Sequence, residues 1–104
     1  MKLELKLNGE TKIYTTSFVS ARQFRKLMEY DQEIDYSNLS LDDVDELAGF
    51  VCNVFDNQFT VDEFYDGIPS HKLISTILNV FIYVRTGKEP ELKKENEEGN
   101  EEGK

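Results

Sequence analysis

Cysteine, histidine, tryptophan and cationic side chains are scarce in this chain. Its 104 residues include one cysteine, one histidine and no tryptophan, and 12 lysines and arginines stand against 21 aspartates and glutamates. A single cysteine cannot form an internal disulfide, and one cysteine with one histidine cannot supply the four ligands of a structural zinc site. The formal net charge of -9 opposes nucleic-acid binding, which requires clustered cations. The composition therefore excludes a disulfide scaffold, a structural zinc domain and a nucleic-acid-binding protein.

Long apolar segments are also missing. No apolar run reaches the roughly 18 residues that a membrane-spanning helix needs. The first residues, Met-Lys-Leu-Glu, lack the apolar segment of a secretory signal peptide. At roughly 100–200 residues per domain, the chain has room for one domain. We therefore expect a small acidic domain in a reducing, cytosolic compartment, without a membrane segment.

The distribution of charge divides the chain in two. Residues 88–104 contain seven glutamates and four lysines, and Leu92 is their one clearly apolar residue. A segment of this composition cannot bury enough apolar surface to offset the entropy that is lost on ordering. We predict a folded domain at 1–87, which is acidic in its own right, and a disordered acidic tail at 88–104.

The first fifteen residues have the pattern of a β-hairpin. Leucines alternate with charged residues over residues 2–7, which is typical of a half-buried strand, and Asn-Gly follows as a strong turn signal. A three-residue loop over residues 8–10 pairs Leu5 with Ile13 and keeps one face apolar, whereas a two-residue loop pairs Leu5 with Lys12. We therefore predict the three-residue loop. A lone hairpin is marginal in water, so it must lie on helices or join a partner's sheet.

From residue 17 onward, apolar residues recur with helical spacing. Ser and Thr residues mark the helix starts as N-caps, and the second and third segments carry acids in their first turn. The pattern predicts an α+β fold that is mostly helical, with the hairpin followed by a small bundle of about four helices. The expected helices run from the Ser20 cap to about Glu33, from the Ser40 cap through Phe55, from the Thr60–Glu63 capping box to a stop at Gly67, and from Ser70 to Arg85 with Gly87 as the exit.

The helical spacing also predicts which residues face the core. Each of the first two helices has an apolar stripe at i, i+3 and i+4 positions. The expected core residues are Ala21, Phe24, Leu27 and Met28 in the first helix and Leu41, Val44, Leu47, Ala48, Val51 and Phe55 in the second.

The last helix is apolar on most of its circumference. Between Leu73 and Val84 only four residues interrupt the apolar run. A helix of this kind is either the central helix of a bundle or part of a subunit interface, and both roles fit on different faces. This pattern leads us to expect a homo-oligomer.

An acidic stretch has part of the spacing of a calcium-binding loop. Asp31, Glu33 and Asp35 lie at its first, third and fifth positions. However, Tyr36 occupies the position that requires glycine, and Asp42 the position of the bidentate glutamate. The stretch is more simply a polar helix exit, and we expect no metal site.

Residues with catalytic potential are few. Cys52 lies in an apolar helical stretch, where a free cysteine is usually a small buried hydrophobe, and His71 lies far from it in sequence. The chain has no glycine-rich phosphate loop and no Gly-x-Ser-x-Gly sequence. We therefore expect no enzymatic activity and no cofactor.

Aromatic residues are dense between Phe50 and Tyr65, where four phenylalanines and a tyrosine occur within sixteen residues. Most of them fit the core, but all five are hard to bury in a domain of 87 residues, and aromatic side chains dominate interface energetics. We expect one or two of them, with part of the last helix, to contact a partner. The candidate partner-binding residues are Phe59, Phe64, Tyr65, Phe81 and Ile82.

Three segments of the chain have a recognisable pattern: Asp42–Leu47, Val51–Phe55 and Asn57–Gly67. They resemble the tail assembly chaperones of long-tailed phages that infect Gram-positive hosts. The resemblance spans roughly Met1 to Gly87, and its most specific part is Gln58–Gly67. The strand pair, the helix around residues 22–30, the apolar last helix and the acidic tail are similar too.

The resemblance implies a non-enzymatic chaperone that binds the tape measure protein during tail morphogenesis. It places the protein in the cytoplasm of the infected host bacterium and not in the mature virion. The resemblance is also compatible with the major tail protein as a second partner and with a longer form made by translational frameshifting near the C-terminus. The alternative from the residues alone is a small acidic adaptor or regulatory module that binds another phage or host protein.

Overall fold

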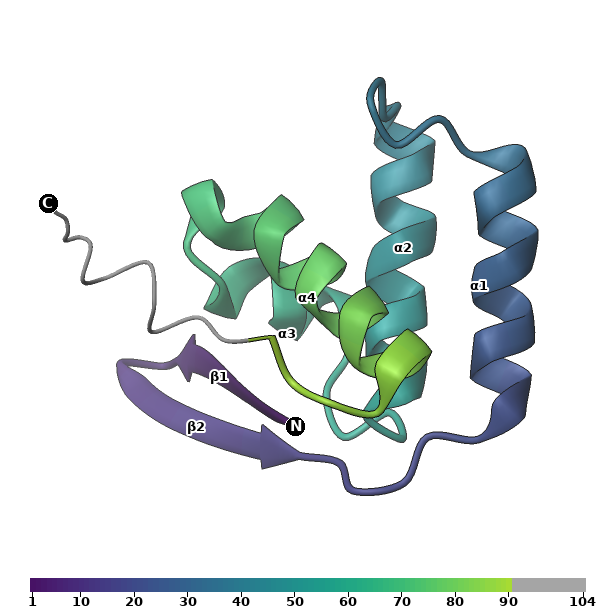
Figure 1. The fold of residues 1–104 in the computed structure, drawn as a ribbon. Coiled ribbons are helices and arrows are strands. Elements are labelled where there is room, and N and C mark those ends of the chain that lie inside the picture. Colours follow the sequence, from purple (N-terminus) through teal and green to yellow (C-terminus); the bar gives the residue numbers. More distant parts are fainter. Residues whose placement is uncertain (91–104) are drawn as a thin grey trace, which may run out of the picture.

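A computed structural model describes residues 1–90, and the predicted tail from residue 91 on lies outside them. The α+β class is confirmed, because an N-terminal hairpin precedes a set of helices (Figure 1). Among the described residues, no helix combines the length and the apolarity that a membrane span requires. The elements are β1 (Lys2–Leu7), β2 (Glu10–Thr15), α1 (Ala21–Glu33), α2 (Leu41–Val54), α3 (Val61–Gly67), the short 3-10 helix η1 (Ser70–Lys72) and α4 (Leu73–Thr86).

The hairpin closes with a two-residue loop, so the predicted three-residue loop is wrong. Leu7 pairs with Glu10 and Leu5 with Lys12. Asn8 and Gly9 both have positive φ, 55° and 79°, as the two-residue type I′ turn demands. The charged partners are tolerated because the two buried leucines of the hairpin, Leu3 and Leu5, both lie on β1. Every β2 residue except half-buried Tyr14 is exposed.

The first three helices begin at the predicted caps. Ser40 and Thr60 each accept a hydrogen bond at 3.0 Å from the backbone amide three residues on. The acidic residues at those positions, Asp43 and Glu63, bond back to the cap amides and complete two capping boxes. Ser20 precedes α1 without a side-chain cap bond.

The last α-helix begins later than predicted. Ser70 starts the 3-10 helix η1, and α4 follows from Leu73 with Lys72 as its N-cap and without a side-chain cap bond. Local sequence therefore determines where the first three helices begin, but not the α-helical start of the fourth.

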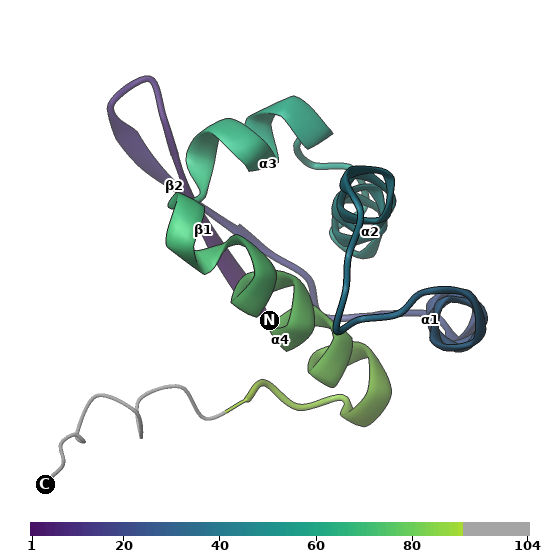
Figure 2. The same cartoon turned by 90° about the horizontal axis from the view of Figure 1, so that it is seen from above.

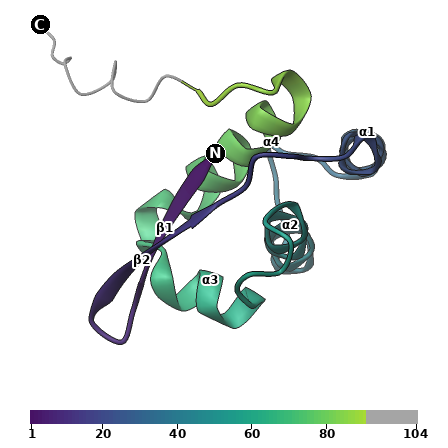
Figure 3. The ribbon, with the colours of Figure 1, turned by 90° about the horizontal axis from the view of Figure 1, so that it is seen from below.

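The helices form an open bundle with the hairpin on one side (Figure 1). α1 and α2 run antiparallel, and both are seen end-on from above in Figure 2 and from below in Figure 3. α4 crosses this pair and contacts both helices, while β1 packs against α3. The left-handed exit of α4 at Gly87, with φ 77°, is as predicted.

Aromatic rings join these elements into one core. Near the hairpin, Phe59 lies 4.9 Å from Tyr14 and 6.1 Å from Phe64, measured between ring centroids. In the bundle, Phe50 makes edge contacts with Tyr30 of α1 at 5.5 Å and Phe81 of α4 at 5.7 Å. The largest fully buried side chains are Phe50, Phe55, Phe64, Leu5, Leu27, Leu47, Ile77, Val51 and Val80.

Four apolar residues that we expected in the core are exposed, and Ala21, the first residue of α1, is one of them. Phe24 and Met28 are 40% and 51% exposed, because α1 turns Leu27 and Tyr30 inward instead. Leu41 is 76% exposed at the first position of α2. The first turn of that helix lies at the end of the bundle, where no other element covers it (Figure 1).

Gly67 has a packing role that differs from the predicted helix stop. Its φ is not positive, and it remains helical as the last residue of α3. A Cβ atom at this position would lie 2.7 Å from the Leu5 Cβ and 3.2 Å from the Lys6 amide nitrogen. The absent side chain is what lets β1 lie directly on α3.

Replacing Gly67 with alanine is expected to destabilise the domain by about 1–3 kcal/mol, because β1 must move away from α3. Gly49→Ala in α2 is the matched control. No atom lies within 4 Å of its added Cβ, so alanine is expected to stabilise that helix by about 0.5–1 kcal/mol. Urea unfolding followed by circular dichroism measures both changes. Equal midpoints for the two variants would contradict the close packing.

Candidate partner-binding surface

The five predicted partner-binding residues fall into two groups. Phe59, Phe64 and Phe81 are at most 3% exposed and pack inside the core, so in this conformation they offer a partner almost no surface. Tyr65 is half-buried, and Ile82 is 41% exposed. The accessible part of the predicted site therefore lies at Tyr65 and Ile82.

The turn between α2 and α3 directs Phe59 inward. Asp56 and Asn57 both adopt left-handed backbone conformations, with φ 58° and 56°, which these two residue types tolerate better than most. The amide of Asn57 bonds to the carbonyl of Cys52 at 2.8 Å and ends the helix tightly. The chain then reverses, and Phe59 enters the hairpin-side core.

Tyr65 is held by the acidic surface of α2. Its hydroxyl donates a hydrogen bond to the Asp45 carboxylate. Burial, and then this carboxylate, raise the pKa of Tyr65 to about 12, so the phenol stays protonated. The hydroxyl is therefore already satisfied, and only part of the ring remains accessible to a partner.

A larger apolar surface lies on α1 and α4. Ile74, Leu78 and Ile82 follow one another at i, i+4 and i+8, so they form a stripe along α4. This stripe faces away from Ile77 and Val80, which are buried. Phe24 and Met28 form a shorter stripe on α1. These five side chains, each 40% to 51% exposed, are called the α1–α4 apolar face: Phe24, Met28, Ile74, Leu78 and Ile82.

An ion pair joins α1 and α4 close to the two stripes. Arg85 donates two hydrogen bonds to the Asp31 carboxylate, at 2.8 and 2.9 Å. Asp31 lies three residues after Met28 on α1, and Arg85 lies three residues after Ile82 on α4. Because residues three apart share a helix face, the bonded pair joins the sides that carry the stripes. The Arg85 guanidinium lowers the pKa of Asp31.

Sequence reasoning identified Ile82 but missed the rest of this face. Phe24 and Met28 were assigned to the core, and Ile74 and Leu78 were not singled out. The detectable signal is the i, i+4, i+8 stripe on α4, which lies opposite a second apolar stripe. The apolar last helix thus has a buried face, as a central helix does, and an exposed apolar face as well.

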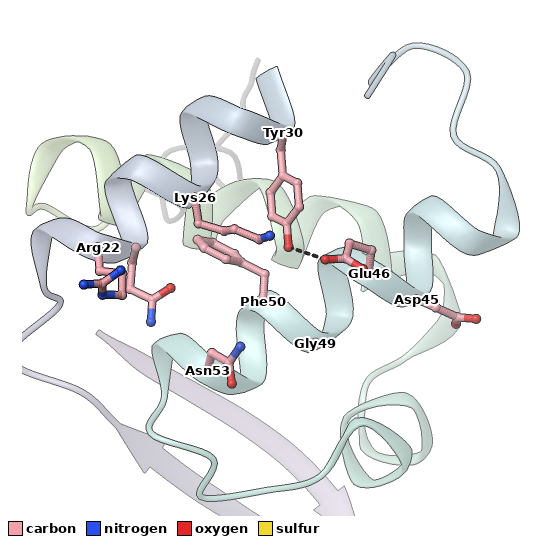
Figure 4. Close-up of a pocket in the computed structure, with 9 residues that line it drawn as sticks. Arg22, Lys26, Tyr30, Asp45, Glu46, Gly49, Phe50 and Asn53 are labelled. Atoms are coloured by element: carbon pink, nitrogen blue, oxygen red, sulfur yellow. Dashed lines mark hydrogen bonds between the residues drawn. The ribbon is translucent and has the colours of Figure 1, made fainter. Parts of the chain in front are cut away.

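A polar groove of about 380 Å³ separates α1 from α2 on another side (Figure 4). Arg22 and Lys26 line its α1 wall, and Glu46 on the α2 wall accepts a hydrogen bond from the Tyr30 hydroxyl at 2.9 Å. Burial, and then Glu46, raise the pKa of Tyr30. Gly49 also lines the groove and has no side chain to fill it. The groove joins a cationic wall to an acidic one, and its tyrosine is held in the protonated form.

Two of the acids considered for a metal site have structural partners. Asp31 is bonded to Arg85, and Asp35 accepts bonds from the amide and hydroxyl of Ser37 at 3.0 and 2.6 Å. Within residues 1–90, no three His, Cys, Asp or Glu side chains converge in a metal-binding group. Burial raises the pKa of the Cys52 thiol to about 11, so it is protonated at neutral pH and is a poor nucleophile.

Charge is segregated along the described chain. Residues 29–66, which include α2 and all of α3 except its last residue, contain twelve acids and no lysine or arginine. Residues 11–28 and 67–88 contain lysines and arginines but no acid, and they supply all five members of the α1–α4 apolar face. The apolar face therefore belongs to the acid-free part of an acidic molecule.

Comparison with known proteins gives one family. A family model described as phage tail chaperone protein matches residues 1–101, nearly the whole chain. No curated protein and no solved structure matches the chain.

Proposed function

The chain belongs to the phage tail chaperone family, and we propose that it acts by binding the tape measure protein of a long-tailed phage during tail assembly. The contact is made by the α1–α4 apolar face, which covers apolar helices of the tape measure protein until the tail tube encloses them. This is a binding function without catalysis.

The observation that carries this proposal is the exposure of five large apolar side chains on two helices that the Arg85–Asp31 ion pair joins. A contiguous apolar patch is costly in water and typically marks an interaction site. Leu78 and Ile82 lie on the half of α4 that the Arg85–Asp31 ion pair joins to α1, and we take them as the best anchors. Of the residues predicted from sequence, Ile82 contributes directly, Tyr65 borders a different surface, and Phe59, Phe64 and Phe81 support the fold beneath.

The distribution of charged residues also supports the chaperone function. A chaperone must keep its complex with an apolar client in solution, and like-charge repulsion between complexes does this. The acids of α2 and α3 lie outside the segments that form the apolar face. One part of the molecule is thus suited to the client, and another to repelling neighbouring complexes.

The proposal extends to the life cycle of the protein. It acts in the infected cell before the tail is complete and is absent from the finished virion. In the absence of a client, the α1–α4 apolar face mediates self-association. The major tail protein is a second partner, and a longer form arises by translational frameshifting.

Co-expression with the tape measure protein tests the function. With this chain present, the tape measure protein is expected to stay in the soluble fraction and to co-purify with it. Without the chain, the tape measure protein is expected to aggregate. Equal solubility in both cases, or no co-purification, would overturn the chaperone function and favour the adaptor module.

A further inference from the structure

The hairpin leaves one edge of β1 open. In an antiparallel pair, alternate residues point their backbone N–H and C=O groups toward the partner strand. Because the Leu7–Glu10 pair closes the turn, the odd-numbered residues of β1 bond to β2, and Lys2, Glu4 and Lys6 point the other way. Within residues 1–90, no hydrogen bond reaches the backbone of Lys2 or Glu4 from outside the hairpin. Two residues thus present unused main-chain donors and acceptors.

A groove runs along this open edge. Its volume is about 840 Å³, and it lies between β1, the α3–α4 connection and the N-terminal half of α4. Lys72, at the end of η1, and Thr76 and Asn79, which share one face of α4, line the helical side. Figures 2 and 3 show β1 running alongside this half of α4. The groove therefore has a strand edge as one wall and a polar helix face as the other.

The polar residues of the groove have spare hydrogen-bonding capacity. Thr76 and Asn79 are half-buried, yet their side chains make no hydrogen bond to any other residue in the range 1–90. A half-buried amide normally finds a partner, because desolvating it without one costs free energy. Asn79 can both donate to and accept from a peptide backbone placed between α4 and β1.

We propose that this groove binds an extended segment of the client protein, which pairs with β1 as a third strand. Main-chain bonds to Lys2 and Glu4 recognise the extended backbone whatever its side chains are. Thr76 and Asn79 contact the other side of the same segment. The inference rests on the proposed function in one respect, since the bound tail protein supplies the segment. It adds a second surface that is independent of the α1–α4 apolar face.

The groove suits a client segment better than a second copy of this chain. If two β1 edges paired about Glu4, Glu4 would lie opposite Glu4, and Lys2 opposite Lys6. Like charges directly opposite each other destabilise a strand pair. Gly67 also lies against the Lys6 amide, so the open edge is limited to the part of β1 that precedes Lys6. A short client segment fits this length.

Glu4→Pro tests the proposal in the full-length chain. Proline at this position removes an outward N–H but no bond to β2, and edge strands tolerate it. Glu4→Thr removes the same charge and keeps the N–H, so it is the matched control. Binding of purified tape measure protein fragments is expected to weaken at least tenfold with Glu4→Pro and less than twofold with Glu4→Thr. Unchanged binding by a folded Glu4→Pro variant would overturn the third-strand proposal and leave the chaperone function standing.

Amide hydrogen exchange of the unmodified chain provides a second test that needs no variant. The Glu4 amide is expected to exchange rapidly in the free protein at all concentrations and to become protected in the complex. Rapid exchange in the complex would overturn the proposal. Protection in the free protein would also overturn it, because the chain itself or a second copy would then occupy the groove. Failure of every fragment to bind would instead overturn the proposed function.

Discussion

Replacing Phe55 with alanine is expected to lower the free energy of unfolding by about 3–5 kcal/mol. Phe55 is fully buried at the end of α2, and its ring centroid lies 5.7 Å from that of Phe59. Its removal leaves a cavity where α2 and the α2–α3 turn meet. Domains of this size are stabilised by only about 5–15 kcal/mol, so much of that stability is lost. Urea unfolding followed by circular dichroism measures the change.

Phe24→Ala is the control for this prediction. The substitution is chemically identical, but Phe24 is 40% exposed, and we expect a loss of about 1 kcal/mol or less. A similar loss for both variants would mean that Phe24 packs as deeply as Phe55, contrary to the structure.

The double substitution Leu78→Gln and Ile82→Gln is expected to weaken client binding by about 2 kcal/mol or more, which is about thirtyfold. It places two polar amides on the α1–α4 apolar face, where the client must desolvate them. The thermal midpoint should change little, because each side chain is about 40% exposed and not in the core. Titration against tape measure protein fragments measures the affinity.

Ile13→Gln is the control for the double variant. Ile13 is 56% exposed on β2, outside the apolar face, so its substitution should leave binding unchanged. Higher salt should weaken wild-type binding only slightly, because apolar contacts are not screened. A steep fall in affinity with salt, or an equal loss with Ile13→Gln, would contradict binding through this face.

Features determined by neighbouring residues were predictable from the sequence. The capping boxes at Ser40 and Thr60 each lie within four residues, and both helices begin where these patterns indicate. The exit of α4 at Gly87 is equally local. For such elements the hydrogen bonds are made inside the element, so no knowledge of the fold is needed.

Features determined by packing between residues far apart in the sequence were not predictable. Pairing Leu5 with Lys12 looks unfavourable when the hairpin is considered alone, but the helices cover β1 while β2 stays exposed, which removes the penalty. Gly67 resembles a helix stop until Leu5 is seen against it. The helical spacing of α4 indicated two apolar faces, and only the position of α1 shows which face is open.

The candidate site shows the same difference between features set by nearby residues and features set by packing. Ile82 was identifiable because α4 has more apolar surface than a small domain can cover. Phe59 looked accessible because it follows a polar turn, and its burial depends on the left-handed backbone at Asp56 and Asn57. Two consecutive residues in that conformation are uncommon, and composition does not specify them.

The contact of Leu5 with Gly67 also constrains the order in which the protein folds during synthesis. The hairpin is translated before all the helices, but an isolated hairpin is marginally stable in water. Its packing partner is separated from it by about sixty residues, and such non-local contacts form slowly. The two strands therefore remain unpacked, with their leucines exposed to solvent, until α3 has been synthesised. For that interval the nascent chaperone is itself an aggregation-prone chain.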